Sequence, residues 1–422
     1  MGKQPRLSRG VALVAAGMSD FGVWPGKDSK DLFLEAFADL RDSADGELDP
    51  GEIQAAYIGN FTNDVFVGQS HWGAILADAL GIVPAPVTRT EGACASSGIA
   101  FREACFAIAS GFYDVVLVGG VEDMSKRSTA EVAEGLALAA TPDERRAGLT
   151  FPGVFGAIAS AYFDRYGASR EHLAAVTIKS HLNAADNPRA QLGRSIREMM
   201  DSKARRARQQ GRTVPEWKDE REFLGDDVVN PVVAEPLHLF DCCPISDGAA
   251  CLLLVAEERA SQFNALPLFV AGIGQGSGRG LQAAEELTSF EATRAAAAEA
   301  YAMAGVNASD IQLAEVHDCF SIAEILHLED LGFFAAGQGA AASLEGRTQR
   351  DGEIPVNTSG GLKCKGHPVG ATGAAQIVEL WLQLRQQAGA RQVGGNDLRL
   401  GLAHNLGGTG GTSTVTILER RD

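Results

Sequence analysis

Residues 91–98 read Glu91-Gly-Ala-Cys94-Ala-Ser-Ser-Gly98 and join a predicted strand, 84–90, to a predicted helix, 99–110. The helix is rich in Ala, Phe and Ile, and Gly111 provides its stop signal. Cys94 is therefore expected at a helix start, where unpaired backbone N–H groups and the positive end of the helix dipole favour the nucleophilic thiolate. Taken alone, however, a cysteine in such a turn is more often a small buried side chain than a catalytic one.

Strand and helix patterns alternate on both sides of this stretch. Strands are predicted at 10–18, 53–58 and 114–120, and helices at 32–44 and 71–80. The run 114–120 is continuously apolar after its first residue, which is typical of a strand that is buried on both faces. The alternation predicts an α/β fold in which helices cover both faces of a sheet.

Residues 121–239 have a different character. Helical and loop patterns mix there, strands are hard to find, and basic residues concentrate at 203–208. The strand pattern returns at 246–255. We therefore predict an insertion within one α/β unit. An excursion of this length usually has a function of its own, such as covering a ligand.

A second α/β unit follows and repeats features of the first. Its strands are predicted at 269–273, 312–316, 400–404 and 412–418, its helices at 291–304 and 373–384, and a Gly-rich turn at 405–411. Cys94 and His367 each stand at a Gly-rich turn that opens a helix. The sequence thus predicts two similar halves, 1–120 with 240–262 and 263–422, and an inserted loop domain at 121–239.

The composition argues against a nucleic acid or a membrane as the main partner. The net charge of the 422-residue chain is −17, whereas binding phosphate by bulk charge needs the opposite sign. No stretch is long enough to span a membrane, and the apolar run 11–17 fits a first strand better than a secretory signal. The seven cysteines show no paired short spacing, so we expect no metal site and a reducing, cytoplasmic location.

Two features that suggest nucleotide or phosphate binding are weak. The glycines of 272–278 do not have the GxGxxG spacing, and the sequence contains no GxxxxGK[ST] motif. The basic run 203–212 is typical of a solvated helix face. Its functional alternative is a cradle for phosphate, for which Arg205 and Arg206 are the candidates.

Further histidines and cysteines stand where a strand or turn meets a helix. His367 lies in a tight Gly-rich turn, where an imidazole that titrates near neutrality suits acid–base chemistry as well as structure. His317 and Cys319 follow the predicted strand 312–316, at an edge that often holds catalytic groups; a structural His-Asp cap is the alternative. With Cys94 they form a cysteine–histidine nucleophile system with a spare acid or base, which suits acyl transfer through a thioester.

Three motifs resemble those of one enzyme family. GACASSG around Cys94, HDCF at 317–320 and NTSGGLKCKGHPVGATG at 357–373 look like the thiolases, in particular the branch related to the thiolase domain of sterol carrier protein X. The resemblance covers nearly the whole chain. The commoner thiolases have Asn in place of His317 and a second catalytic Cys in a C-terminal CxG turn, whereas this chain has His404-Asn-Leu-Gly407 there. In the resembling branch the HDCF motif supplies that cysteine, which gives the role to Cys319.

The resemblance implies a five-layered αβαβα thiolase fold and a loop domain that binds coenzyme A. Cys94 would carry the acyl group, His367 would take its proton, and Cys319 would move the proton at Cα of a second acyl-CoA. His317 with His367 would hold the enolate oxygen. The backbone N–H groups of Cys94 and of Gly407, or of a neighbour of Gly407, would hold the other oxyanion.

Coenzyme A and acyl-CoA are the implied substrates, with no permanently bound cofactor. Ser246 and the pair Arg205 and Arg206 are candidates for substrate contacts. The resemblance also implies a homodimer or tetramer and, in some members, an OB-fold accessory protein. The expected activity is that of an acyl-CoA C-acyltransferase that makes or breaks a carbon–carbon bond in 3-ketoacyl-CoA. Two alternatives stay open: an acyltransferase or aldolase for a steroid or polyketide-type substrate, and a non-catalytic lipid- or CoA-binding subunit.

Overall fold

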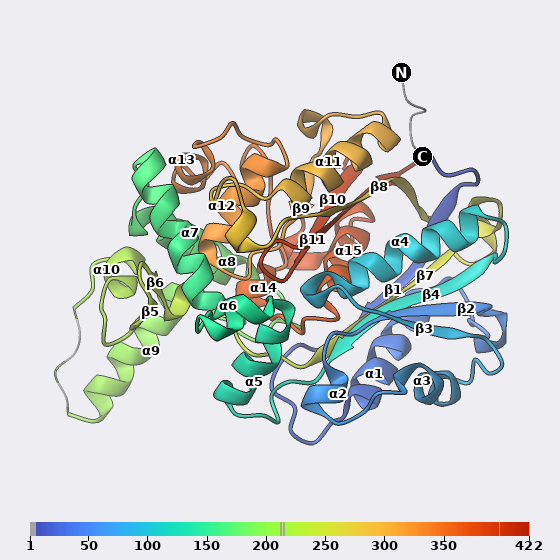
Figure 1. Ribbon diagram of the computed structural model, residues 1–422, viewed down its shortest axis with the longest axis horizontal. Coiled ribbons are helices and arrows are strands. Elements are labelled where there is room, and N and C mark those ends of the chain that lie inside the picture. Colours follow the sequence, from blue (N-terminus) through green and yellow to red (C-terminus); the bar gives the residue numbers. More distant parts are fainter. Residues whose placement is uncertain (1–5, 212, 214–215, 396, 422) are drawn as a thin grey trace.

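Nine strands form the sheet at the centre of the molecule (Figure 1). The computed structural model describes residues 6–211, 213, 216–395 and 397–421. The first half of the sheet consists of β1 (Val11–Met18), β2 (Ala55–Gly59), β3 (Val87–Thr90), β4 (Val115–Glu122) and β7 (Gly248–Ala256). The second half consists of β8 (Leu268–Ser277), β9 (Leu313–Glu315), β10 (Leu400–Gly407) and β11 (Thr412–Arg420). The strand order is β3-β2-β4-β7-β1-β8-β11-β10-β9.

The strands follow the same order in both halves. In the first half, β7 lies between β1 and β4 and is antiparallel to both, and β2 and β3 continue in parallel from β4. In the second half, β11 lies between β8 and β10 and is antiparallel to both, and β9 continues in parallel from β10. The half-sheets join where β1 pairs with β8, at Ala12–Phe269 and Leu13–Leu268. The repeat suits two similar units, and the boundaries that we predicted for them remain a proposal.

Helices on both sides of each half-sheet give the molecule five layers (Figure 1). Helices α1 (Ser29–Asp42) and α3 (Trp72–Leu80) cover the outer face of the first half-sheet. Helices α4 (Ser96–Ala109) and α15 (Thr372–Leu384) lie between the half-sheets, and α11 (Glu291–Ala304) covers the outer face of the second. The predicted αβαβα thiolase fold is confirmed. Four further helices are α2 (Asn63–Phe66), α12 (Ser321–Asp330), α13 (Gly339–Leu344) and α14 (Gly361–Cys364).

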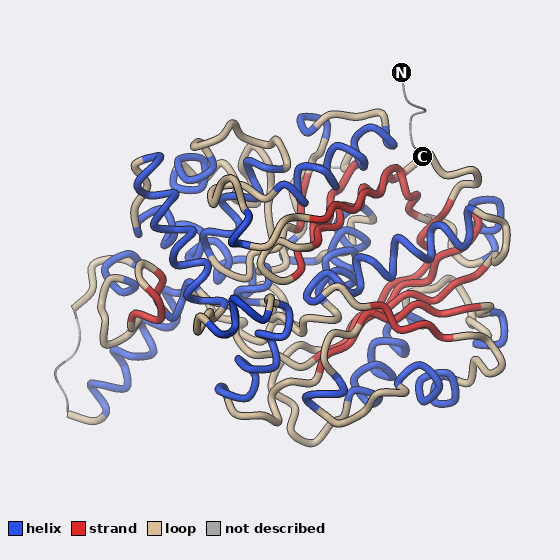
Figure 2. The backbone as a smooth tube through the Cα atoms, in the orientation of Figure 1, coloured by secondary structure: helices blue, strands red, loops and turns tan. Residues whose placement is uncertain are grey.

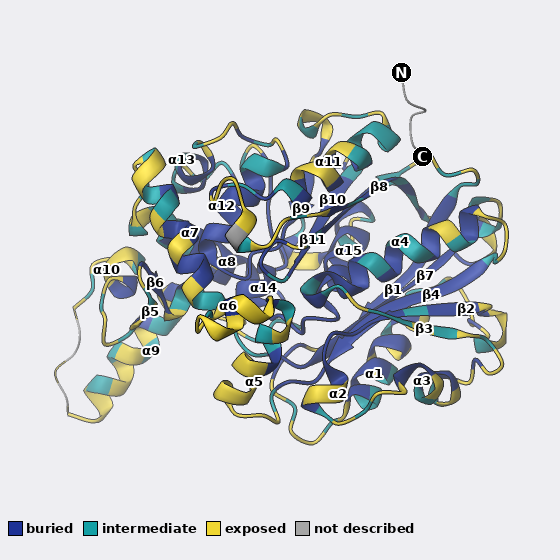
Figure 3. Ribbon diagram, in the orientation of Figure 1, coloured by how far each residue is buried: buried dark blue, intermediate teal, exposed yellow. Residues whose placement is uncertain are grey.

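The central strands are apolar along their whole length because both of their faces are covered. Every residue of β1, β4 and β7 is buried (Figure 3). In β1, Val11 and Leu13 contact the middle helical layer, whereas Ala12 and Val14 contact the outer one. Since successive side chains point to opposite faces, a strand between two helical layers needs apolar residues at every position.

The chain between β4 and β7 forms mostly helices (Figure 2). They are α5 (Thr129–Leu136), α6 (Pro142–Arg146), α7 (Phe151–Tyr166), α8 (Arg170–Ala185), α9 (Ile196–Gln209) and α10 (Glu220–Leu224). A short hairpin of β5 (Val232–Ala234) and β6 (Leu237–His238) accompanies them, and its length explains the absence of a clear strand pattern. Within the described residues, no helix combines the length and the apolar composition needed to cross a membrane.

One predicted turn is wrong in part. We expected 405–411 to be a Gly-rich connection, but β10 runs through Gly407, and Asn405, Leu406 and Gly407 pair with residues of β11. The sheet satisfies the backbone hydrogen bonds of this segment, so its turn-forming composition does not decide its structure. Asn405 therefore lies in a buried strand next to the helices of the middle layer.

Candidate active site

Cys94 lies in a tight turn of 3-10 helix, Ala93–Ala95, directly before α4. The Ser96 hydroxyl holds this turn, because it accepts from the Gly92 N–H and donates to the Ala93 carbonyl. Gly407 of β10 packs against the Gly92 carbonyl, where a Cβ would come within 2.1 Å of the oxygen. The small residues of this stretch therefore bring the Cys94 turn and the end of β10 into direct contact.

Burial, rather than the helix dipole, controls the protonation of Cys94. Burial raises the pKa of the Cys94 thiol to about 12, although a hydrogen bond from the backbone N–H of Gly408 to the sulfur opposes this shift. Our expectation of a thiolate at this helix start is therefore wrong for the free protein. Cys94 is a neutral thiol, and it needs a base in order to react.

His367 is held in place by two hydroxyl groups. Its backbone N–H donates to Ser246 Oγ at 2.9 Å, and its Nδ1 lies 2.7 Å from Thr372 Oγ1. Ser246 also donates to Gln191 Oε1 at 2.5 Å, so the structure places this candidate substrate contact as a support of the His367 turn. Burial lowers the pKa of His367 to about 3, which keeps the imidazole neutral in the free protein, so one of its ring nitrogens has a free lone pair.

His317 lies in the loop between β9 and α12. Its Nδ1 is 3.1 Å from Asn405 Nδ2, and its backbone N–H donates to His404 Nδ1 at 3.4 Å. Burial, together with the neighbouring His367 and His404, holds the pKa of His317 well below its ordinary value. The His317 ring is therefore also neutral, and His317 is held by two adjacent residues of β10, Asn405 and His404.

Cys319 lies in the same loop as His317. Its carbonyl accepts from the Cys243 N–H at 3.0 Å, which ties the loop to the segment before β7. Burial, with the nearby thiols of Cys243 and Cys94, raises the pKa of Cys319 well above its ordinary value. Cys319 is thus a second neutral thiol, which carries a proton in the free protein.

One cavity of about 220 Å³ brings Cys94, His317, Cys319 and His367 together. The Cys94 sulfur and one ring nitrogen from each histidine lie within 4.8 Å of one another, and the two rings are nearly perpendicular, at 85°. The other walls are mainly apolar and include Phe61, Val132, Leu136, Phe151, Ile245, Phe320 and Val369. A nucleophile, two neutral imidazoles and a second thiol in an apolar cavity are suited to acyl transfer.

Four predicted site residues, Ser246, Arg205, Arg206 and Gly407, do not line this cavity. Arg205 and Arg206 are exposed on α9 and are not among the described residues that line it. Their contact with a substrate phosphate stays a prediction. Gly407 packs against Gly92, whereas its neighbour Gly408 lines the cavity and directs its N–H at the Cys94 sulfur. Of the two glycines, Gly408 is the one whose backbone N–H contacts the Cys94 sulfur, and the oxyanion role expected for Gly407 or a neighbour stays a prediction.

Glu122, which the sequence did not single out, ties the surrounding loops together. Its carboxylate accepts from the backbone N–H groups of Phe61, Thr62 and Gly370 at 3.0–3.1 Å and from Asn60 Nδ2 at 3.2 Å. Burial raises the pKa of Glu122 to about 7, and these donors oppose that shift. In the sequence, the one signal that could have pointed to Glu122 is its position as an acidic residue directly after a continuously apolar strand.

The variant Glu122→Gln is expected to lower the free energy of unfolding by about 2–6 kcal/mol, as measured by urea denaturation. All four neighbours are donors, so the amide NH₂ would face two of them and leave buried N–H groups unpaired, at about 1–3 kcal/mol each. The matched control is Glu131→Gln, which changes the same side chain at an exposed helix start. Equal stability of the Glu122→Gln variant and the wild type would contradict this role.

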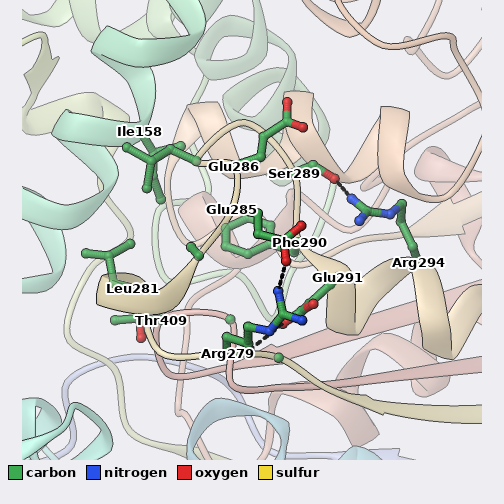
Figure 4. Close-up of a pocket in the computed structure, with 14 residues that line it drawn as sticks. Ile158, Arg279, Leu281, Glu285, Glu286, Ser289, Phe290, Glu291, Arg294 and Thr409 are labelled. Carbon is green, nitrogen blue, oxygen red and sulfur yellow. Dashed lines mark hydrogen bonds and ion pairs between the residues drawn. The ribbon is translucent and has the colours of Figure 1, made fainter.

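A smaller cavity of about 120 Å³ involves Thr409 and Gly410, which follow Gly408 (Figure 4). Its charged side chains are already paired with one another or with polar neighbours, as in Arg279 with Glu285 and Arg294 with Ser289. Cysteine and histidine are absent from the described residues that line it. It therefore offers neither the nucleophile nor the base found at Cys94.

Comparison with known proteins identifies the class. Residues 11–258 match the family model of the thiolase N-terminal domain, and residues 275–420 match that of the thiolase C-terminal domain-like family. The chain belongs to the thiolase family. Acetyl-CoA acetyltransferase of Methanothermobacter thermautotrophicus is 40% identical over 415 residues, which cover 98% of this chain and 100% of that protein.

Two further relatives extend the comparison. Human sterol carrier protein 2 is 31% identical over 432 residues, which cover 98% of this chain and 72% of that protein. The solved Ltp2-ChsH2(DUF35) aldolase has a TM-score of 0.77 and 25% identity, over 97% of this chain and 98% of that one. The chain is a thiolase-type acyltransferase, an enzyme whose substrates are thioesters of coenzyme A.

Proposed function

We propose that Cys94 carries the acyl group and that His367 is its base. The observation that carries this proposal is the group of three reactive atoms, from Cys94, His317 and His367, within 4.8 Å inside one cavity. As the thiol attacks the thioester carbonyl, its proton passes to His367, and the departing CoA thiolate takes that proton. The backbone N–H groups of Cys94 and Gly408 hold the oxyanion of this step.

In the carbon–carbon step, Cys319 moves the proton. In synthesis, Cys319 first gives its proton to neutral His367, and the resulting thiolate removes a proton from Cα of a second acyl-CoA. The enolate attacks the acyl group on Cys94, and the Cys94 thiolate that leaves takes the proton from His367. In degradation, Cys319 gives its proton to the departing enolate, and its raised pKa suits this direction because the thiol is protonated in the free protein. His317 and His367 face the same cavity and hold the enolate oxygen.

The cavity volume favours a short acyl chain. About 220 Å³ is below the usual size of a site for a drug-sized ligand, and bulky side chains such as Phe61, Leu136 and Phe151 line it. Acetoacetyl-CoA is therefore our proposed substrate for thiolysis. The name of the acetyl-CoA acetyltransferase relative supports this choice.

With CoA present, we expect kcat/KM for acetoacetyl-CoA to exceed that for a 3-ketoacyl-CoA of ten or more carbons by at least about tenfold. A long chain has to displace packed side chains, whereas a two-carbon unit fits the cavity. Chromatography of the acetyl-CoA formed over time measures both rates. Equal or faster cleavage of the long substrate would contradict the proposed substrate class.

An aldolase is the second candidate, because the Ltp2-ChsH2(DUF35) aldolase shares the fold over nearly the whole chain. The two activities differ in their use of CoA: a thiolase consumes CoA when it cleaves its substrate, and an aldolase does not. Retention of Cys94, His317, Cys319 and His367 in one cavity favours the thiolase, since an aldolase has no use for an acyl-cysteine. The same retention argues against a non-catalytic lipid-binding subunit.

We also propose a homodimer or tetramer that works in the cytoplasm. The edge strand β3 is partly exposed and has a pairing partner on one side, β2, which suits association through the sheet edge. Seven free cysteines suit a reducing compartment. An accessory protein, expected from the resemblance to have an OB fold, is a further proposed partner, and the DUF35 protein in the solved aldolase complex supports the idea of such a subunit.

A further inference from the structure

We propose that Asn405 and Thr372 are positioning residues that hold His317 and His367 in opposite tautomers. In this arrangement His317 presents an Nε2–H donor to the cavity, and His367 presents an Nε2 lone pair. The inference deepens the proposed function, on which it rests: it says why two histidines in the same cavity have different tasks.

The contact between Asn405 and His317 has one direction. Asn405 Nδ2 lies 3.1 Å from His317 Nδ1, and an amide nitrogen has hydrogens to give but no lone pair to offer. Nδ1 of His317 must therefore accept. Because the buried ring is neutral, its one proton is on Nε2. His317, which lines the cavity, is thus a hydrogen-bond donor toward the substrate.

The surrounding helices fix the orientation of the Asn405 amide. Its Oδ1 faces Gly98 and Gly373, where added Cβ atoms would lie 3.3 and 2.5 Å from the oxygen. These glycines are in the first turns of α4 and α15, whose positive ends favour an oxygen over an NH₂ group. The oxygen makes no hydrogen bond with the described residues, but a rotated amide would turn its hydrogens toward the positive ends of both helices, which is less favourable. The oxygen therefore stays with the helices, and the nitrogen faces His317.

Thr372 sets the tautomer of the His367 ring. Its hydroxyl donates to the Pro368 carbonyl at 3.0 Å, one turn back along the chain. With its only hydrogen used there, Thr372 Oγ1 accepts from Nδ1–H of His367 at 2.7 Å. The neutral His367 ring then carries no proton on Nε2, the nitrogen that is free to take the proton of Cys94.

Opposite tautomers divide the chemistry between the two histidines. His367 can accept the Cys94 proton without rearrangement and return it to the CoA thiolate that leaves. His317 can donate to the enolate oxygen throughout the carbon–carbon step, whereas His367 donates only while it holds the proton from Cys94 or Cys319. The pattern also leaves one imidazole lone pair beside the Cys94 sulfur, so the three clustered atoms are better suited to proton transfer than to a metal ion.

The first test separates the two half-reactions in Asn405→Asp. A carboxylate oxygen in place of the NH₂ group accepts from Nδ1–H and so removes the proton from His317 Nε2. We expect the thiolysis of acetoacetyl-CoA to fall by about 10²–10³-fold, as for other lost oxyanion donors, while exchange of labelled CoA with acetyl-CoA stays within about threefold of the wild type. An equal loss in both reactions, or no loss, would overturn the assignment of His317.

The second test uses Thr372→Val, with Thr372→Ser as its matched control. Valine keeps the shape of the side chain but cannot accept from Nδ1–H, so we expect CoA exchange to fall by about tenfold or more, because the base loses its fixed tautomer. Serine restores the acceptor and should restore exchange. Wild-type exchange in Thr372→Val, or failure of Thr372→Ser to recover it, would overturn the role of Thr372.

A direct measurement uses the wild-type enzyme, so it does not depend on the folding of a variant. The ¹⁵N NMR spectrum of enzyme labelled at histidine, with His317→Gln and His367→Gln for assignment, reports which ring nitrogen carries the proton. We expect Nε2–H for His317 and Nδ1–H for His367, and the same tautomer in both would overturn the inference. Failure of the proposed function is distinct, because the wild type would then show no CoA exchange at all.

Discussion

Replacing Cys94 by alanine is expected to lower the thiolysis of acetoacetyl-CoA by at least about 10⁴-fold and to abolish the exchange of CoA with acetyl-CoA. Both reactions pass through an acyl group on this sulfur. Cys94 is also the thiol that receives the Gly408 N–H and lies within 4.8 Å of both histidines. Spectrophotometric thiolysis and isotope exchange measure the two losses.

The matched control is Cys105→Ala, which makes the same change in α4, the helix that directly follows the Cys94 turn. Cys105 is fully buried in the core between the half-sheets and does not line the active-site cavity. We expect this variant to lose some stability and to keep its activity when folded. A Cys94→Ala enzyme that keeps more than about one hundredth of wild-type thiolysis would exclude the acyl-cysteine mechanism at this position.

The second large effect is expected for Cys319→Ala. General acid–base groups typically contribute about 10²–10⁴-fold, so we expect thiolysis to fall by that amount because the enolate has lost its proton donor. Formation of the acyl-enzyme does not need Cys319, and exchange of CoA with acetyl-CoA should continue. The separation of the two reactions, measured on one preparation, is the signature of this residue.

Cys243→Ala is the informative companion, because Cys243 lines the same cavity and its backbone contacts Cys319. If Cys243→Ala stops thiolysis and Cys319→Ala does not, the proton shuttle belongs to Cys243. If Cys319→Ala stops exchange as well, the residue supports the cavity rather than the carbon–carbon step. Our account requires that only Cys319→Ala separates the two reactions.

The sequence pattern predicts much of the fold because burial on two faces leaves a clear signal. The apolar part of the strand predicted at 114–120, residues 115–120, lies in β4, and the helix predicted at 291–304 has the bounds of α11. Local composition fails where tertiary hydrogen bonds decide the structure. Asn405-Leu-Gly407 looks like a turn, yet pairing with β11 makes it part of a buried strand.

The sequence predicts individual residues of the candidate site but not how they come together. Turns that open helices point to Cys94 and His367, but their approach across the fold depends on how the two half-sheets join, which local patterns do not encode. The motif resemblance supplied that connection. The protonation states were out of reach, since a helix start favours the Cys94 thiolate while burial, which outweighs it, is known only from the packed structure.

The supporting residues were missed for a similar reason. Thr372 lies within a recognised motif and Asn405 within an expected turn, and each has an ordinary structural explanation in the sequence. Their importance comes from single contacts, Thr372 with Nδ1 of His367 and Asn405 with Nδ1 of His317. The Asn405 contact joins two segments that only the fold brings together, and the Thr372 contact orients the His367 ring within one turn.

The most direct test of the account is to locate the acyl group. The enzyme is mixed with acetyl-CoA, quenched in acid within a fraction of a second, digested, and analysed by tandem mass spectrometry. We predict an acetyl group on Cys94 and none on Cys242, Cys243 or Cys319, which line the same cavity. An acetyl group on any of these three cysteines, with Cys94 unmodified, would contradict the central claim.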